Sequence, residues 1–215
     1  MKKKGIRSRG EVMDSFRRFV PDHFVSYITD LFLNANVRFS IVKSRNTKLG
    51  DFRAGIKGEK HRITVNGDLN PYSFLVTTLH EFAHLHTFNM YGHRVQPHGK
   101  EWKEEFKRLL IPVIDSGELP REIENALVRS LTSIKASSCS DYHLSKALAE
   151  HDSLEDGIQL LEKLPPQSVF SLNGRQFIKG PLRRKRYVCR EVASNRSFLI
   201  SSLAKVNLID HDKKL

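Results

Sequence analysis

The chain has few cysteines and no long apolar run, the features on which disulfide-rich proteins and membrane proteins depend. Its 215 residues include only two cysteines, Cys139 and Cys189. They are too few for a disulfide framework and too far apart for a cysteine-based zinc site, so we expect free thiols in a reducing cytoplasm. No apolar run approaches the roughly 20 residues of a membrane helix. The basic start, residues 1–9, lacks the apolar segment of a signal peptide, so export is not expected.

Acidic residues are also scarce, with 24 Asp and Glu against 36 Lys and Arg, which gives a net charge of +12. The excess is uneven, because residues 1–70 carry +8, residues 71–164 carry −4 and residues 165–215 carry +8. Concentrated positive charge attracts polyanions whatever their sequence, so we expect a nucleic-acid partner. For any single cluster, a merely soluble surface is the alternative.

The most specific pattern in the sequence is His80-Glu81-Phe82-Ala83-His84. Two residues four apart on a helix project from the same face, so both imidazoles can reach one metal ion. Glu81 lies one position along, where it can hold a metal-bound water without being a ligand itself. A catalytic Zn²⁺ keeps one position for water and uses a neighbouring carboxylate as general base, whereas a structural zinc does not. Glu81 therefore favours catalysis over metal binding alone.

The motif lies in a segment with independent signs of a helix. Asn70 and Pro71 are typical of a helix start and Gly92 of a helix end. A second helix is predicted over residues 98–111, ended by Pro112. The apolar residues that recur at helical spacing are Phe74, Leu75, Leu79, Phe82 and Ala83 in the first helix, and Trp102, Phe106, Leu109 and Leu110 in the second. The two apolar faces are expected to pack together.

A catalytic zinc usually has three protein ligands, so the sequence should supply one more. His98 is the best candidate, because it opens the second helix, whose apolar face would aim it at the first. His86 is two positions beyond His84 and should face away. The alternatives that remain are His93 and three glutamates of the second helix, Glu101, Glu104 and Glu105.

The run Thr78–His84, followed by His98-Gly99 and Trp102, resembles the SprT-like zinc metalloprotease domain. Bacterial SprT proteins and the eukaryotic Spartan proteases, which degrade proteins crosslinked to DNA, share that domain. The similarity extends over about residues 10–112. It implies one zinc ion held by His80, His84 and His98, with Glu81 as general base. It also implies an α+β fold with a zincin-like, minigluzincin core, in which a small sheet lies beside the metal helix.

Upstream of the motif, residues 11–35 are expected to form one broken or two short helices, interrupted at Pro21. Strands are predicted at about 37–43, 50–56 and 60–66, with a hairpin turn between the last two. In a zincin, a strand beside the metal helix forms an edge with which an extended substrate can pair. We assign that role to residues 60–66.

Downstream, residues 119–135 and 141–151 carry helical periodicity. We therefore divide the chain into a metal-binding core over 1–112, a helical extension over 113–160 and a small basic β module over 161–215.

The β module begins with a strong hairpin signal, Asn173-Gly174 flanked by alternating residues. Further strands are expected at 186–192 and 197–200. Many relatives carry a four-cysteine zinc ribbon at this end, but only Cys189 is available, so no second zinc is inferred. A basic loop contains Arg183, Arg184, Lys185 and Arg186. With Tyr187 and Phe177 nearby, it suits contact with a nucleic-acid backbone and base stacking.

The sequence thus predicts a zinc-dependent endopeptidase that acts on proteins at or near DNA and has no membrane partner. The alternative is a nucleic-acid-associated stress or transcription factor whose metalloprotease core has little activity. A zinc hydrolase of small amides is less well supported, because nothing marks a small-molecule pocket.

Overall fold

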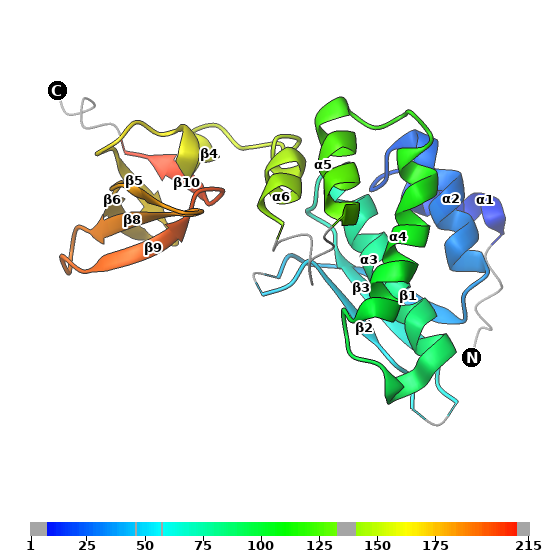
Figure 1. The fold of residues 1–215 in the computed structure, drawn as a ribbon. Coiled ribbons are helices and arrows are strands. Elements are labelled where there is room, and N and C mark those ends of the chain that lie inside the picture. The colour runs from blue at the N-terminus through cyan, green and yellow to red at the C-terminus, as the bar shows by residue number, and fades with distance from the viewer. Residues whose placement is uncertain (1–7, 46, 57, 133–140, 210–215) are drawn as a thin grey trace, which may run out of the picture. The chain divides into compact units, whose positions relative to one another are not determined.

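The computed structural model describes residues 8–45, 47–56, 58–132 and 141–209 (Figure 1). Contacts between residues divide the chain into two compact units, residues 1–152 and residues 153–215. The first unit combines helices with a small sheet and the second is built mainly of strands, which confirms the predicted α+β class. Within the described ranges, no helix has both the length and the apolar character needed to cross a membrane.

The described part of the first unit contains six α-helices and three strands. The helices are α1 (Arg9–Phe16), α2 (Asp22–Leu33), α3 (Pro71–Tyr91), α4 (Lys100–Ile114), α5 (Arg121–Thr132) and α6 (Tyr142–Ala149). The strands are β1 (Val37–Val42), β2 (Gly50–Arg53) and β3 (His61–Asn66). Two short helices separated at Pro21 are therefore confirmed. The predicted extension of α5 to residue 135 lies outside the described residues.

The three strands are ordered β1-β3-β2, with β1 parallel and β2 antiparallel to β3. The assignment of residues 60–66 to an open edge is therefore wrong. The parallel strand β1 pairs with the side of β3 that the β2–β3 hairpin leaves open, so β3 is the centre of the sheet. The edges are β1 and β2.

One face of this sheet packs on the core of the first unit. Phe39, Ile63 and Phe52 lie in one cross-strand row and belong to the same hydrophobic cluster as the inner side of α3. Because side chains alternate along a strand, the residues before and after them point to the opposite face. The sheet therefore has an inner apolar face and an outer polar one.

Helix α3 forms where the sequence signals predict it. The Asn70 side chain accepts a hydrogen bond from the Ser73 amide at 2.9 Å, Pro71 is the first helical residue, and Gly92 ends the helix at φ 61°. The predicted end of α4 at Pro112 is wrong by three residues, since the helix continues to Ile114. Pro112 cannot donate a backbone hydrogen bond to the Arg108 carbonyl, and α4 ends two residues after it.

Helices α5 and α6 belong to the same core as α3 and α4. Ile123 and Leu127 on α5 are fully buried, as is most of Leu144 on α6. Asn70, which begins α3, also donates from its side-chain nitrogen to the Leu148 carbonyl at 2.9 Å. This contact ties the last helix of the unit to the start of the helix that carries the motif.

The second unit contains a seven-stranded sheet. Its strands are β4 (Ile158–Leu160), β5 (Val169–Leu172), β6 (Arg175–Ile178), β7 (Leu182–Arg183), β8 (Arg186–Glu191), β9 (Ser197–Ser201) and β10 (Lys205–Leu208). The predicted β5–β6 hairpin is confirmed, and its turn residues Asn173 and Gly174 have φ values of 50° and 75°, as a type I′ turn requires. Cys189 and Phe177 are buried in the core of this unit.

Candidate metal centre

Three histidines that are distant in sequence meet at one point of the first unit. The Nε2 atoms of His80 and His84 are 3.2 Å apart, those of His84 and His98 are 3.0 Å apart, and those of His98 and His80 are 3.3 Å apart. Among the described residues, these three form the group of His, Cys, Asp and Glu side chains that is positioned to bind a metal ion.

Two structural elements bring the three rings together. His80 and His84 lie one turn apart on α3, and His98 lies in the turn just before α4. His98 has a φ of 61°, a left-handed conformation that is uncommon for a residue other than glycine and that occurs often at functional sites. Trp102, which is 1% exposed, packs against all three imidazoles with ring centroids 4.7, 5.2 and 4.7 Å away.

The spacing of the three nitrogens fits zinc. In a tetrahedral site with Zn–N bonds of about 2.0–2.1 Å, the ligand nitrogens lie about 3.3–3.4 Å apart. The observed separations of 3.0 to 3.3 Å are close to that value. Three imidazoles without a fourth protein ligand are also a donor set found in catalytic zinc sites. The residues present are therefore compatible with zinc.

The environment keeps the histidines neutral, which is the form that binds metal. Burial, followed by the proximity of His84 and His98, lowers the pKa of His80 to about 3. Burial and His98 lower the pKa of His84 to about 4. Burial also lowers the pKa of His98. Protons therefore compete weakly with a metal ion at neutral pH.

Glu81 is only 5% exposed, and its carboxyl group lies against β2. Burial and the negative charge of Asp51 raise the pKa of Glu81 to about 8. Arg45, Lys48 and a backbone hydrogen bond from Phe52 act in the opposite direction. In the metal-free chain, Glu81 therefore holds its proton at neutral pH.

The other candidate ligands do not join the three histidines. The Nδ1 atom of His86 is 2.9 Å from the Arg108 guanidinium and 3.5 Å from the carboxylate of Glu105. Glu105 in turn forms an ion pair with Arg108 at 2.7 Å. The side chains of His93, Glu101 and Glu104 are likewise outside the metal-binding group.

Residues 21–114, from the start of α2 to the end of α4, match the family model described as the SprT-like family. Residues 21–114 form an SprT-like domain. The family recognised in the sequence is thus confirmed over this part of the chain, and it points to a metallopeptidase-related function. Searches of curated proteins and of solved structures find no match to the chain.

Strand β2 supplies parts of the SprT-like site that sequence reasoning missed. A methyl group at Gly50 would overlap the carboxylate of Glu81 and would lie 2.8 Å from the Thr77 methyl. The Phe52 ring stacks on His84, with centroids 6.3 Å apart and an interplanar angle of 8°. A glycine in a predicted strand often marks the close approach of another group, so Gly50 in the strand predicted at 50–56 was the sequence feature that could have indicated this contact.

We expect acid to destabilise the metal-free protein through the histidines of the SprT-like domain. Below about pH 6.5 the unfolded chain takes up protons at His80 and His84, whereas the folded chain does not until about pH 3 to 4, so unfolding becomes more favourable as the pH falls. Glu81 opposes this, because its raised pKa means that the folded chain keeps a proton that the unfolded chain loses above about pH 4.5.

The Glu81→Gln variant removes the opposing group and isolates the histidines. In a thermal melt of this variant without metal, Tm should be several degrees lower at pH 5 than at pH 7. Adding His80→Gln should reduce the difference, and the remainder is expected from His84, His98 and His86, whose pKa values are also lowered by burial. An equal Tm at both pH values would show that the imidazoles are not held in their neutral form.

The basic loop predicted from the sequence is the exposed turn between β7 and β8. Arg183 and Arg186 pair across the hairpin, and Arg184 has a φ of 59° at the turn. The proposed stacking by Phe177 is wrong, because this ring is 3% exposed and packs on Phe170 inside the unit. Tyr187 lies under the ammonium of Lys179, 4.1 Å from its ring centroid.

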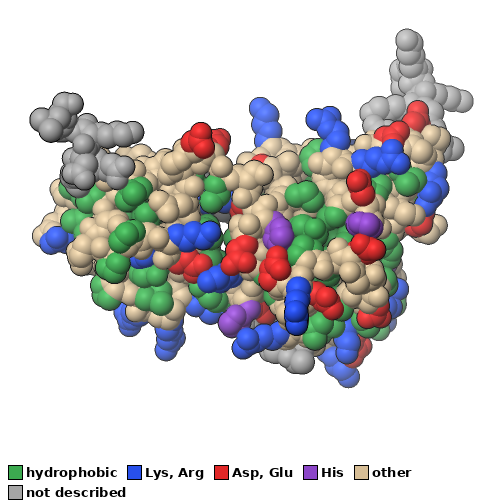
Figure 2. Space-filling model, turned by 90° about the horizontal axis from the view of Figure 1, so that it is seen from above, with side chains coloured by type: hydrophobic (Ala, Val, Ile, Leu, Met, Phe, Trp, Pro, Cys, Tyr) green, Lys and Arg blue, Asp and Glu red, His purple; other side chains and the backbone are tan. Residues whose placement is uncertain are grey.

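Charged side chains elsewhere are mixed in sign on the surface that Figure 2 shows. Lys and Arg side chains are spread over that face with Asp and Glu among them, rather than collected in one patch. On this face the positive charge is therefore not gathered into one basic patch.

Proposed function

We propose that this chain is a zinc-dependent endopeptidase with a zincin-like, minigluzincin core, and that it acts on proteins at or near DNA. The observation that carries the proposal is the convergence of His80, His84 and His98, directly next in sequence to a buried carboxyl group, Glu81. Structural zinc sites do not need such a carboxyl group, but hydrolytic sites do.

The residues of the chain have distinct roles in this mechanism. A zinc ion held by the three histidines would act as a Lewis acid and lower the pKa of a bound water to about 7. A nearby cation would also lower the pKa of Glu81 from its metal-free value of about 8, so that its carboxylate could accept a proton. Glu81 would take this proton from the water that attacks the scissile carbonyl carbon, and would return it to the amine nitrogen as the C–N bond breaks. Trp102 restricts the rotation of the imidazoles by packing against them.

A depression beside one of the three histidines has room for a substrate side chain. A depression of about 270 Å³ lies beside His84 and Trp102, and its apolar lining includes Phe52, Phe88 and Val95. A substrate side chain of apolar character fits such a lining. The edge strand next to this depression is β2, so we assign backbone pairing with an extended substrate to β2 instead of β3.

Gly50→Ala tests whether β2 positions Glu81. The added methyl would displace the Glu81 side chain, so we expect peptide cleavage to fall by about tenfold or more, while zinc content stays near one ion per chain. Gly10→Ala on α1 is the matched control, because its methyl would meet only the Ser8 hydroxyl at 3.9 Å. Normal cleavage by Gly50→Ala would remove β2 from the catalytic arrangement.

The proposed activity is tested with the purified full chain and an unfolded protein such as casein. We expect cleavage that stops on chelation and returns when zinc is restored, with and without single-stranded DNA in parallel reactions. A zinc-loaded protein that cleaves nothing under either condition would contradict the proposal.

A nucleic-acid-associated factor with little proteolytic activity is the second candidate. It is favoured by the β7–β8 turn, where Arg183, Arg184 and Arg186 are all exposed. DNA binding that weakens steeply with salt, without any cleavage, would select this candidate.

A further inference from the structure

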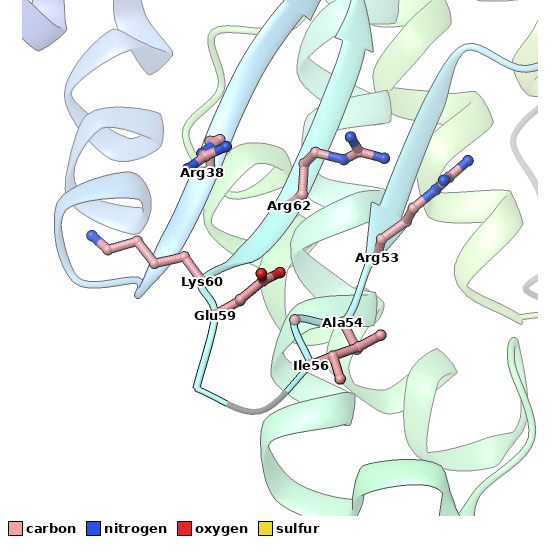
Figure 3. A pocket seen from close by; sticks show the side chains of 8 residues that line it. Arg38, Arg53, Ala54, Ile56, Glu59, Lys60 and Arg62 are labelled. Atoms are coloured by element: carbon pink, nitrogen blue, oxygen red, sulfur yellow. The ribbon is translucent and has the colours of Figure 1, made fainter.

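The outer face of the three-stranded sheet carries a row of three arginines. Arg38 on β1 is paired in register with Arg62 on β3, and Arg62 is paired with Arg53 on β2. All three side chains are exposed and project from the same side of the sheet (Figure 3). The next row on this face, Ser40, Thr64 and Asp51, is polar but carries only one charge.

These arginines line a shallow depression of about 440 Å³ at the end of the β2–β3 hairpin. Lys60 adds a fourth cation to its wall, and Glu59 is the acidic residue that lines it. Positive charge therefore exceeds negative charge inside the depression.

Most of this positive charge has no ion-pair partner among the described residues. Arg53 forms an ion pair with Asp51 at 2.9 Å, but Asp51 is shared with Lys48 at 2.8 Å. For Arg38, Lys60 and Arg62, the described part of the chain provides no ion pair within 4.0 Å. Like charges directly opposite each other on neighbouring strands destabilise a sheet, so an external anion would relieve this arrangement.

We propose that this arginine row binds the phosphate groups of a nucleic-acid strand. Guanidinium groups donate two parallel hydrogen bonds to a phosphate, which makes arginine well suited to this ligand. Neighbouring strands are about 4.8 Å apart, so the row extends over roughly 10 Å. A single small anion cannot reach all of these exposed cations, whereas a chain of phosphates neutralises several at once and releases their counterions.

The arginine row is not part of the metal centre, but strand β2 contributes a residue to each. On β2, Phe52 points inward and stacks on His84, and the next residue, Arg53, points to the outer face. A nucleic-acid strand on the outer face would therefore lie across the sheet from the three histidines. The inference shares with the proposed function only the association with nucleic acid, and it requires no catalysis.

The test measures binding of a fluorescent oligothymidylate by the full chain at several salt concentrations. The double variant Arg38→Gln/Arg62→Gln should bind about tenfold more weakly at low salt. Its slope of log affinity against log salt should be smaller by about 1.4, which corresponds to two lost contacts with a single strand. The control variant Lys103→Gln/Lys107→Gln removes the same charge from the exposed side of α4. It should change the low-salt affinity and the salt slope much less than the arginine variant does.

Several outcomes would overturn the inference. One is a double variant that binds with the affinity and salt slope of the original chain, and another is an equal loss in the lysine control. Equal competition by oligoglutamate of the same charge would indicate an acidic polypeptide instead of phosphate. The double variant should melt at the same temperature as the original chain or higher, since a repulsion is removed. If it melts lower, Arg38→Lys/Arg62→Lys tests the row with charge retained, and it must keep the full salt slope.

Two further variants separate this inference from the proposed function. If Arg183→Gln/Arg184→Gln abolishes binding while the sheet variant binds normally, nucleic acid is bound by the second unit and the arginine row is excluded. The Glu81→Gln variant should bind the oligonucleotide normally even if it cleaves nothing. A failure of proteolysis therefore leaves the binding result interpretable.

Discussion

Glu81→Gln should reduce peptide cleavage by about 10²- to 10⁴-fold while zinc content remains at one ion per chain. The size of the loss is that expected when a general base is removed. Glutamine has nearly the shape of glutamic acid, but its amide cannot accept a proton at neutral pH. Because Glu81 is not among the three converging side chains, its replacement should leave the metal site intact.

This variant should also be folded. The pKa of Glu81 is raised to about 8 by burial and by Asp51, so the metal-free protein already holds a neutral side chain at this position near pH 7. A neutral amide in its place adds no buried charge. We therefore expect the metal-free variant to melt at or above the temperature of the original chain.

Glu104→Gln is the matched control for Glu81→Gln. Glu104 is exposed on α4 and forms a long, 4.0 Å ion pair with Lys100. Cleavage of casein and zinc content should both be unchanged in this control. Normal cleavage by Glu81→Gln itself would show that another group performs the proton transfer, and the mechanism given above would be wrong.

His98→Asn should lower zinc affinity by more than about 100-fold, since loss of a direct ligand exceeds the 10- to 100-fold effect of losing an outer contact. Asparagine is preferable to alanine here, because His98 has a φ of 61° and asparagine tolerates the left-handed region. The measurement is competition for zinc with a chelator of known affinity. Proteolysis at limiting zinc should fall in parallel.

His93→Asn is the control for His98→Asn, since it also lies in the segment between α3 and α4 but outside the converging group. Its zinc affinity should match that of the original chain. If the two variants behave in the opposite way, His93 is the third ligand. If neither changes affinity, a glutamate of α4 must replace the histidine.

Features that depend on neighbouring residues could be predicted from the sequence. The cap at Asn70 and Pro71, the end of α3 at Gly92 and the Asn173-Gly174 turn all formed as expected. In each case the backbone conformation is determined within a few residues, by a side-chain hydrogen bond or by tolerance of positive φ. The projection of His80 and His84 from one helix face follows from helical periodicity in the same way.

Features that depend on residues far apart in the sequence were predicted less accurately. Residues 60–66 were expected at an edge, yet β3 is central, because the pairing of β1 with β3 is not encoded in the pattern of either strand. The contact of Gly50 with Glu81 joins residues 31 positions apart. Phe177 was expected at a nucleic-acid surface, but alternation along β6 places it in the core of the second unit.

The sequence by itself determined the helix that carries two imidazoles and a carboxyl group, because a single helix fixes their relative directions. Tertiary structure decided that His98 completes the group, that β2 lies against Glu81, and that three arginines from separate strands form one row. These arrangements depend on how helices pack and how strands pair. Such contacts join segments that are far apart in the sequence, and the local sequence pattern does not show which of them lie close together in the fold.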